Sequence, residues 1–266
     1  MRVLVTNDDG YGEPGINSII AGLRKRHEVY VMAPAANQSG TSNSIHLTKP
    51  LEIKKISDVE YTLGGSPADC VITSVKSDIF DFKFDAVVSG INKGFNIGTD
   101  MIYSGTCGAA RQAVISGIPG IAVSMQLKDE YSDKWNDLSY WNFDELSEFV
   151  SKNLEELCKM CVVTKDGLMP EKKACFVNIN AFSIPKFKGV KFTDVCFREY
   201  IHDKVKIEQG EFNVMSVFSG GPGSTKSRKY SDYDACMEDC ISISRILAEP
   251  TAADDGFNLD SIKFSL

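Results

Sequence analysis

Two adjacent carboxylates follow the first apolar run of the chain, and they are the residues best suited to chemistry. Val3, Leu4 and Val5 are too few for a helix and predict a strand that is buried on both faces of a parallel sheet. Asp8 and Asp9 come just beyond that strand, where ligands bind in open α/β sheets. Carboxylates this close repel each other unless a cation or a shared proton lies between them, which favours a hard divalent metal ion. A turn in which Asp9 caps the following helix is the alternative.

A glycine-rich loop over residues 93–106 is the second stretch whose residues are suited to bind a ligand or take part in a reaction. It follows a buried strand over 84–92, which ends at Asn92, and it leads into an alanine-rich helix. Free backbone N–H groups, hydroxyls and the positive end of a helix dipole suit a phosphate group, and Ser104 and Thr106 stand at this helix start. The loop matches neither a Walker A motif nor a dinucleotide-binding fingerprint. An ordinary Ser/Thr helix cap is the alternative, although structureless loops this long are usually functional.

Periodicity predicts the elements that position these loops. A helix over 16–26 and a strand over 28–33 complete a β-α-β unit with a right-handed crossover. The polar loop over 35–44 would then begin beside Asp8 and Asp9. It is rich in side-chain oxygens, although a plain solvated loop has the same composition.

Strands and helices continue to alternate along the chain. Strands are predicted over 84–92, 120–124 and 174–179, and a loose β excursion is predicted over 45–63. A helix is predicted to start at the capping-box signals Ser66, Pro67 and Asp69. Two further helices are predicted over 107–116 and 144–161. This alternation predicts a doubly wound α/β sheet. The composition changes beyond residue 187 to charged, β-like runs. We therefore expect an α/β catalytic domain over 1–186, a β-rich extension that serves as an oligomerisation arm over 187–246, and a C-terminal tail over 247–266 that returns to the domain.

Composition limits the class of protein. The chain has 266 residues, of which 43% are hydrophobic, and a formal net charge of −7. This charge argues against a nucleic acid polymer as partner, because proteins that bind phosphate backbones carry clustered Lys and Arg. The sequence shows neither a basic leader with an apolar core nor an apolar run long enough to span a membrane. We therefore expect a cytoplasmic protein without a membrane partner.

The eight cysteines are expected to be free, buried thiols, because most lie in apolar runs of a long chain. Cys158 and Cys161 have the spacing of a redox or zinc pair, but no second pair at zinc-site spacing accompanies them. A structural role is therefore favoured for both.

Five motifs that occur in order over residues 1 to about 125 resemble those of the SurE family of survival proteins. They are Thr6-Asn7-Asp8-Asp9-Gly10, Gln38-Ser39-Gly40, Gly65-Ser66-Pro67-Ala68-Asp69-Cys70-Val71, Ser89-Gly90-Ile91-Asn92-Lys93-Gly94 and Tyr103-Ser104-Gly105-Thr106. The resemblance implies a three-layer αβα, Rossmann-like fold with a mostly parallel sheet. It also implies a 5′-nucleotidase, a metal-dependent phosphomonoesterase that acts on nucleoside 5′-monophosphates, with 3′-monophosphates as an open alternative.

The resemblance also assigns roles to residues of this sequence. It makes Asp8, Asp9, Ser39 and Asn92 the metal ligands, and it places Asn96, Ser104, Gly105 and Thr106 near the phosphate. One divalent cation per subunit is implied, and Mg²⁺ or Mn²⁺ suits ligands that are all oxygens. SurE-like proteins exchange a carboxyl-terminal arm, so a homodimer or homotetramer is expected through residues 187–246. The later motif fits less well, since Tyr230–Ala235 and Cys240–Ser244 are a degraded form of the family pattern.

Several alternatives stay open at the level of sequence. A metal-bound water, Asp9 as general base, or Asp8 as a covalent phosphoryl acceptor would each hydrolyse a phosphate ester. Other small phosphate esters or polyphosphate are alternative substrates. A phosphatase with an aspartyl nucleophile usually has Asp-x-Asp instead of adjacent carboxylates. A receiver-like, Mg²⁺-binding signalling module needs a phosphoacceptor Asp where this chain has Asn92.

Overall fold

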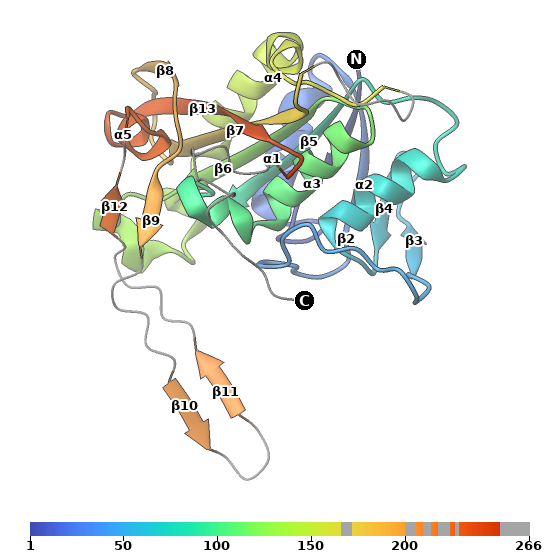
Figure 1. The fold of residues 1–266 in the computed structure, drawn as a ribbon, viewed down its shortest axis with the longest axis horizontal. Coiled ribbons are helices and arrows are strands. Elements are labelled where there is room, and N and C mark those ends of the chain that lie inside the picture. Colours follow the sequence, from blue (N-terminus) through green and yellow to red (C-terminus); the bar gives the residue numbers. More distant parts are fainter. Residues whose placement is uncertain (166–171, 200–205, 210–213, 218–223, 227–228, 251–266) are drawn as a thin grey trace, which may run out of the picture.

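The computed structural model describes residues 1–165, 172–199, 206–209, 214–217, 224–226 and 229–250, and Figure 1 shows its ribbon. Nine strands form the central sheet: β1 (Arg2–Thr6), β2 (Glu28–Pro34), β3 (Ile53–Lys55), β4 (Glu60–Leu63), β5 (Ala86–Lys93), β6 (Gly120–Gln126), β7 (Cys175–Phe182), β8 (Gly189–Phe192) and β13 (Cys240–Leu247). Their spatial order is β3-β4-β2-β1-β5-β6-β7-β13-β8.

The strand order of the sheet reverses at β1, because successive strands are added on one side of β1 first and on its other side afterwards. Strand β2 pairs with one edge of β1 and β5 with the other, and both pairings are parallel. The parallel part continues through β4 on one side and through β6 and β7 on the other. The loops after β1 and β5 therefore leave the sheet at a topological switch point, where ligands bind in such folds.

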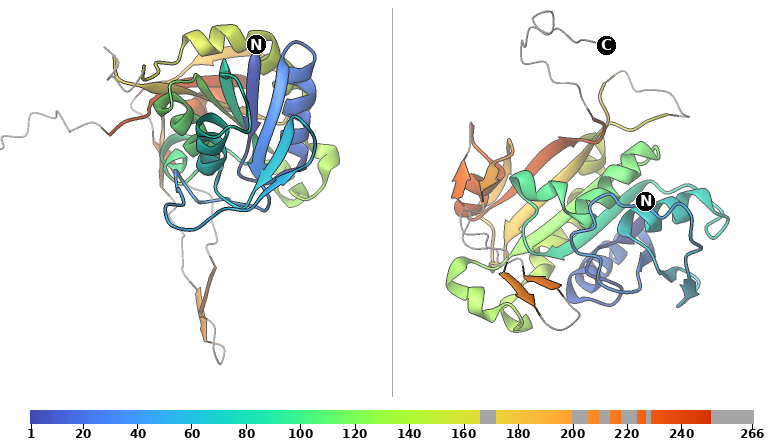
Figure 2. Two further views of the ribbon diagram at one scale, coloured as in Figure 1. Left: turned by 90° about the vertical axis from the view of Figure 1, so that its right-hand side faces the viewer. Right: turned by 60° about the horizontal axis from the view of Figure 1, so that its bottom comes forward.

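Helices cover both faces of the sheet and make three layers, as the sequence predicts (Figure 2). Helices α1 (Pro14–Arg24) and α4 (Phe143–Lys159) pack together on one face, and α2 (Pro67–Lys76) and α3 (Gly105–Ile115) pack together on the other. Val3 and Val5 belong to the core under α1 and α4, whereas Leu4 belongs to the core under α2 and α3. All three side chains are fully buried, which stabilises the fold by about 1.5–3 kcal/mol for each of them.

Helices α2 and α1 differ in how their N-termini are capped. Ser66 Oγ accepts from the Asp69 backbone N–H at 3.1 Å and Asp69 Oδ2 accepts from the Ser66 N–H at 2.9 Å, so the predicted capping box of α2 is confirmed. Helix α1 begins instead after Glu13 without a side-chain cap. The interpretation of Asp9 as the cap of this helix is therefore wrong.

Part of the expected extension belongs to the central sheet. Strand β13 lies between β7 and β8, antiparallel to β7 and parallel to β8, and its first five residues are buried. The sheet therefore does not end at residue 186, because a strand near the end of the described chain covers the edge that β7 would otherwise expose. The division into residues 1–186, 187–246 and 247–266 stays a prediction.

The remaining strands of this region form two separate antiparallel pairs. Strand β9 (Phe197–Glu199) pairs with β12 (Ser224–Lys226), and β10 (Lys206–Gln209) pairs with β11 (Val214–Val217). Figures 1 and 2 show the β10–β11 pair well away from the α/β body. The short helix α5 (Asp232–Met237) precedes β13.

Three 3₁₀-helices complete the described elements: η1 (Gly98–Ile102), η2 (Asp129–Lys134) and η3 (Leu138–Tyr140). Beyond β13, the Ala248 N–H donates to the Ala174 carbonyl at 2.8 Å, and the tail from residue 251 onward lies outside the described residues. Within the described parts of the chain, no helix combines the length and the apolar character that a membrane crossing requires.

Candidate active site

Asp8 lies at the switch point, where the loop after β1 meets the start of α3. Its side chain is 3% exposed. Oδ2 accepts from the Thr106 backbone N–H at 3.0 Å, and Oδ1 accepts from the Thr106 hydroxyl at 2.5 Å. Burial raises the pKa of Asp8, and the hydrogen bonds from Thr106 oppose that rise. Asp8 is thus held rigidly by both of its oxygens.

Gly105 is what lets α3 approach Asp8 so closely. A Cβ at this position would lie 2.9 Å from Asp8 Cβ and 3.1 Å from Asp8 Oδ2. It would also lie 3.1 Å from the hydroxyl of Thr41. Any side chain here must displace the carboxylate or the polar loop after β2.

Asp9 faces the open side of the same loop. Its Oδ2 accepts from the Lys93 backbone N–H at 3.2 Å, so the end of β5 orients it. Burial and the charges of Asp8 and Glu13 raise the pKa of Asp9 to about 7, and the hydrogen bond from Lys93 opposes that rise. Two carboxylates with raised pKa values therefore stand next to each other.

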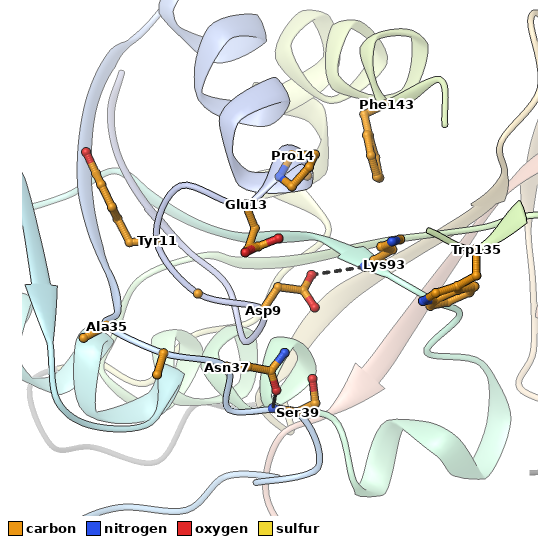
Figure 3. Close-up of a pocket in the computed structure, with 13 residues that line it drawn as sticks. Asp9, Tyr11, Glu13, Pro14, Ala35, Asn37, Ser39, Lys93, Trp135 and Phe143 are labelled. Carbon is orange, nitrogen blue, oxygen red and sulfur yellow. Dashed lines mark hydrogen bonds between the residues drawn. The ribbon is translucent and has the colours of Figure 1, made fainter. Parts of the chain in front are cut away.

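The polar loop after β2 joins this site, as the β-α-β prediction requires. The Gln38 N–H donates to the Asp8 carbonyl at 2.7 Å, and the Ser42 N–H donates to the Tyr103 carbonyl at 3.0 Å. Ser39 is exposed, and Figure 3 shows its hydroxyl pointing toward Asp9. The loop therefore directs a hydroxyl oxygen toward Asp9.

Asn92 lies at the end of β5, just after an irregularity in the pairing of β5 with β6. Its Nδ2 donates to the Gly94 carbonyl at 2.9 Å, which leaves Oδ1 as the side-chain atom suited to bind a cation. Its neighbour Lys93 orients Asp9, so Asn92 belongs to the segment that completes the site.

A cavity of about 400 Å³ opens beside Asp9 (Figure 3). It is lined by Asp9, Gly10, Tyr11, Glu13, Pro14, Gly15, Ala35, Ala36, Asn37, Ser39, Lys93, Trp135 and Phe143. Asp9 and Ser39 thus share one cavity, whereas Asp8 and Asn92 do not line it. Among these lining side chains, Lys93 carries the positive charge and Asp9 and Glu13 the negative ones.

The residues assigned to the phosphate have other contacts in this structure. Ser104 Oγ accepts from the Cys107 N–H at 3.0 Å and caps α3. Thr106 donates to Asp8, and Gly105 lets the helix start lie close to Asp8. The Asn96 side chain is buried and donates to Ser124 Oγ at 2.8 Å. Contact of these four residues with a phosphate stays a prediction.

Asp8 and Asp9 fit a bound cation. Burial disfavours the charged form of both carboxylates, and the charge of Asp8 further disfavours that of Asp9, so a divalent ion would relieve both effects. The described residues contain no group of three or more His, Cys, Asp or Glu arranged to hold a metal. A cation here would therefore depend on neutral oxygens from Ser39 and Asn92 besides the two carboxylates.

Cys158 lies in the last turn of α4 and Cys161 just beyond that helix. Both thiols are free, as are the other six cysteines. Burial raises the pKa of Cys158 to about 12 and that of Cys161 to about 11, which disfavours the thiolate form of both.

Comparison with known proteins decides the family. The family model described as "Survival protein SurE" matches residues 3–202. The chain belongs to the SurE family. It is 34% identical over 265 residues to the 5′-nucleotidase SurE of Aliarcobacter butzleri, with 98% of each chain covered. It is 35% identical over 257 residues to the 5′-nucleotidase SurE of Kosmotoga olearia, covering 93% of this chain and 92% of that one.

A solved SurE structure confirms the fold class. The SurE protein from Aquifex aeolicus superposes with a TM-score of 0.72 at 28% sequence identity, covering 94% of this chain and 95% of that one. The three-layer, mostly parallel αβα architecture and the resemblance to the SurE family are therefore both confirmed.

Glu13, Lys93 and Trp135 are among the cavity residues to which the sequence assigned no role. Glu13 follows Asp9 in the same loop, so a search for further carboxylates near that pair would have found it. Lys93 stands directly after Asn92 inside a family motif. Trp135 comes from the connection between β6 and α4, and nothing in its local sequence points to a site.

Proposed function

We infer that this SurE-family chain is a 5′-nucleotidase, a hydrolase that converts a nucleoside 5′-monophosphate into nucleoside and phosphate. Its relatives from Aliarcobacter butzleri and Kosmotoga olearia carry that name. The observation that carries the inference is the Asp8–Asp9 pair at the switch point. It stands beside a cavity of about 400 Å³, a size typical of small-molecule sites.

We propose Asp8, Asp9, Ser39 and Asn92 as ligands of one divalent cation per subunit, with Mg²⁺ or Mn²⁺ favoured by the all-oxygen set. When bound, this ion supplies positive charge for the phosphate oxygens and lowers the pKa of a water. Ser104, Gly105, Thr106 and Asn96 are proposed to lie near the phosphate.

The two carboxylates are proposed to have different roles, with Asp8 as a ligand only and Asp9 as a ligand and general base. Both oxygens of Asp8 accept hydrogen bonds from Thr106 and the side chain is 3% exposed, which argues against Asp8 as a covalent phosphoryl acceptor. Asp9 lines the cavity and uses Oδ2 for the Lys93 N–H. Its Oδ1 has the capacity to receive the proton of an attacking water.

The receiver-like alternative has no support among the relatives described above, which are nucleotidases by name. Other small phosphate esters, 3′-monophosphates and polyphosphate are alternatives of substrate within the same chemistry, and a substrate panel separates them.

Activity on AMP is expected to disappear in EDTA and to return with Mg²⁺ or Mn²⁺, because all four proposed ligands offer oxygen. The measurement is phosphate release from AMP, 3′-AMP, glycerol 2-phosphate and polyphosphate, each with and without metal. Full turnover in EDTA, or return with Zn²⁺ alone, would contradict the assigned ligands.

We also propose that the chain forms a homodimer or homotetramer through residues 187–246. Strand β8 is an edge of the central sheet, and its Phe192 is 74% exposed. The β10–β11 pair lies away from the body, and an isolated two-stranded hairpin has little stability of its own. A partner subunit would cover both features.

Light scattering at micromolar concentration is expected to give at least the dimer mass for the intact chain. Replacement of residues 200–223 by a short Gly/Ser turn should reduce the mass to that of a monomer and leave the circular dichroism spectrum of the α/β body unchanged. A monodisperse monomer for the intact chain would refute the proposal.

A reducing, cytoplasmic compartment is proposed for this enzyme. All eight cysteines are free, and free thiols persist where the surroundings are reducing.

A further inference from the structure

One side of the cavity is aromatic. Trp135 and Phe143 line it together with Lys93, and Figure 3 shows the Trp135 ring across the cavity from Asp9, with Lys93 between them. Phe143 and its neighbour Trp141 are buried, with exposed fractions of 6% and 7%, whereas Trp135 is only partly buried. Trp135 therefore has exposed ring surface that a ligand could contact, whereas the rings of Trp141 and Phe143 are buried in the core.

The Trp135 ring is held in place from several sides. Its edge-on contact with Trp141 has a centroid distance of 5.1 Å and an interplanar angle of 85°, and Trp141 is itself stacked on Phe143 at 5.3 Å and 11°. The indole N–H of Trp141 donates to the Trp135 carbonyl at 3.2 Å. A ring fixed in this way loses little conformational entropy when a ligand contacts it.

The segment after β5 joins this aromatic wall to the carboxylates. The Lys93 N–H donates to Asp9 at 3.2 Å, while its ammonium group lies 5.3 Å from the Trp135 ring centroid and 5.2 Å from that of Trp141. Gly94 follows with φ +127°, and a Cβ there would lie 3.4 Å from Trp135. One backbone segment thus positions Asp9 at one end of the cavity and an aromatic face at the other.

We propose that the nucleobase of the substrate stacks on Trp135 while its phosphate lies at Asp8 and Asp9. This proposal rests on the proposed nucleotidase function and names the part of the substrate that the chain recognises apart from the phosphate. Stacking accepts every base because every base has a π face, and purines offer more overlap than pyrimidines. Trp135 is therefore a specificity-determining residue for nucleotides over phosphate esters that lack a base.

The first test compares AMP with glycerol 2-phosphate, which has a phosphate ester but no base. Trp135→Ala is expected to lower kcat/KM for AMP about tenfold, mainly through KM, because stacking contributes that much per base. Its kcat/KM for glycerol 2-phosphate should stay within about twofold of the wild type. Trp135→Phe should recover most of the loss, since it keeps an aromatic face.

Tyr131→Ala is the matched control. Tyr131 is an exposed aromatic residue of η2, four positions before Trp135, and it does not line the cavity. Tyr131→Ala should leave kcat/KM unchanged for both AMP and glycerol 2-phosphate. An equal loss on AMP and glycerol 2-phosphate in Trp135→Ala would assign Trp135 a purely structural role and overturn the proposal. A wild type that hydrolyses glycerol 2-phosphate but not AMP would instead refute the nucleotidase function itself.

The second test needs neither metal nor turnover. The chain has two tryptophans, so Trp141→Phe leaves Trp135 as the sole one and Trp135→Phe leaves Trp141. In EDTA, adenosine is expected to quench the fluorescence of Trp141→Phe, and ribose is not. Trp135→Phe should show no quenching by adenosine, because Trp141 is buried. Absence of quenching in both the wild type and Trp141→Phe would overturn the proposal even if Trp135→Ala failed to fold.

Discussion

Asp9→Asn is expected to lower kcat/KM for AMP on the order of 10³-fold or more, as loss of a residue that acts on the reacting group does. The substitution removes one of the two proposed carboxylate ligands, and Asp9 is the one of these two that lines the cavity. Calorimetric titration with Mn²⁺ should show no binding in the same variant. The paired measurements are the metal titration and phosphate release.

The folded state should survive this change. Burial and the neighbouring charges raise the pKa of Asp9 to about 7, so without a cation the carboxylate is a poorly compensated charge. Metal-free Asp9→Asn is therefore expected to unfold at a temperature no lower than the metal-free wild type. A variant with full turnover, or one that is unfolded at 25 °C, would contradict the assignment.

Asp8→Asn provides the contrast for stability. Thr106 donates to both oxygens of Asp8, whereas an Asn offers one oxygen and turns its amide against the other donor. This variant should lose activity to the same extent as Asp9→Asn. It should also lose about 1–3 kcal/mol of unfolding free energy, since a buried donor is left unpaired.

If Asp8 binds the cation as proposed, Gly105→Ala is expected to lower Mn²⁺ affinity about 10–100-fold, the usual effect of disturbing the groups that orient a metal ligand. The added Cβ would lie 2.9 Å from Asp8 Cβ, closer than two carbon atoms approach without a shift. The loss of kcat/KM for AMP should follow the loss of metal affinity and should be partly recovered at high Mn²⁺ concentration.

Gly189→Ala is the control for this prediction. A Cβ at Gly189 in β8 would meet its nearest neighbour at 3.9 Å, an ordinary van der Waals contact. It should change neither metal affinity nor turnover. Equal behaviour of the two variants would show that the start of α3 does not position Asp8.

Local sequence patterns were sufficient to predict strand β1 and the start of helix α2. The run from Val3 to Val5 predicts β1 because a short apolar run buried on both faces has no other common structure in an alternating chain. Ser66 and Asp69 predict the start of α2 because a capping box satisfies backbone donors within three residues of each other. The Asp8–Asp9 pair follows from β1, since both carboxylates leave the same strand.

Contacts between residues far apart in sequence were decided by the tertiary structure. Thr106 binds Asp8 across 98 residues and Lys93 binds Asp9 across 84, and neither bond follows from local pattern. Strand β13 enters the sheet beside β7 because that edge needs a partner, although its charged surroundings in sequence suggest a separate extension. Trp135 reaches the cavity from a connection without a motif. Local sequence determines periodicity and caps, because these depend on neighbours a few residues away. The partners of Asp8, Asp9 and Trp135 depend on which elements the sheet brings together, and only the folded chain decides that.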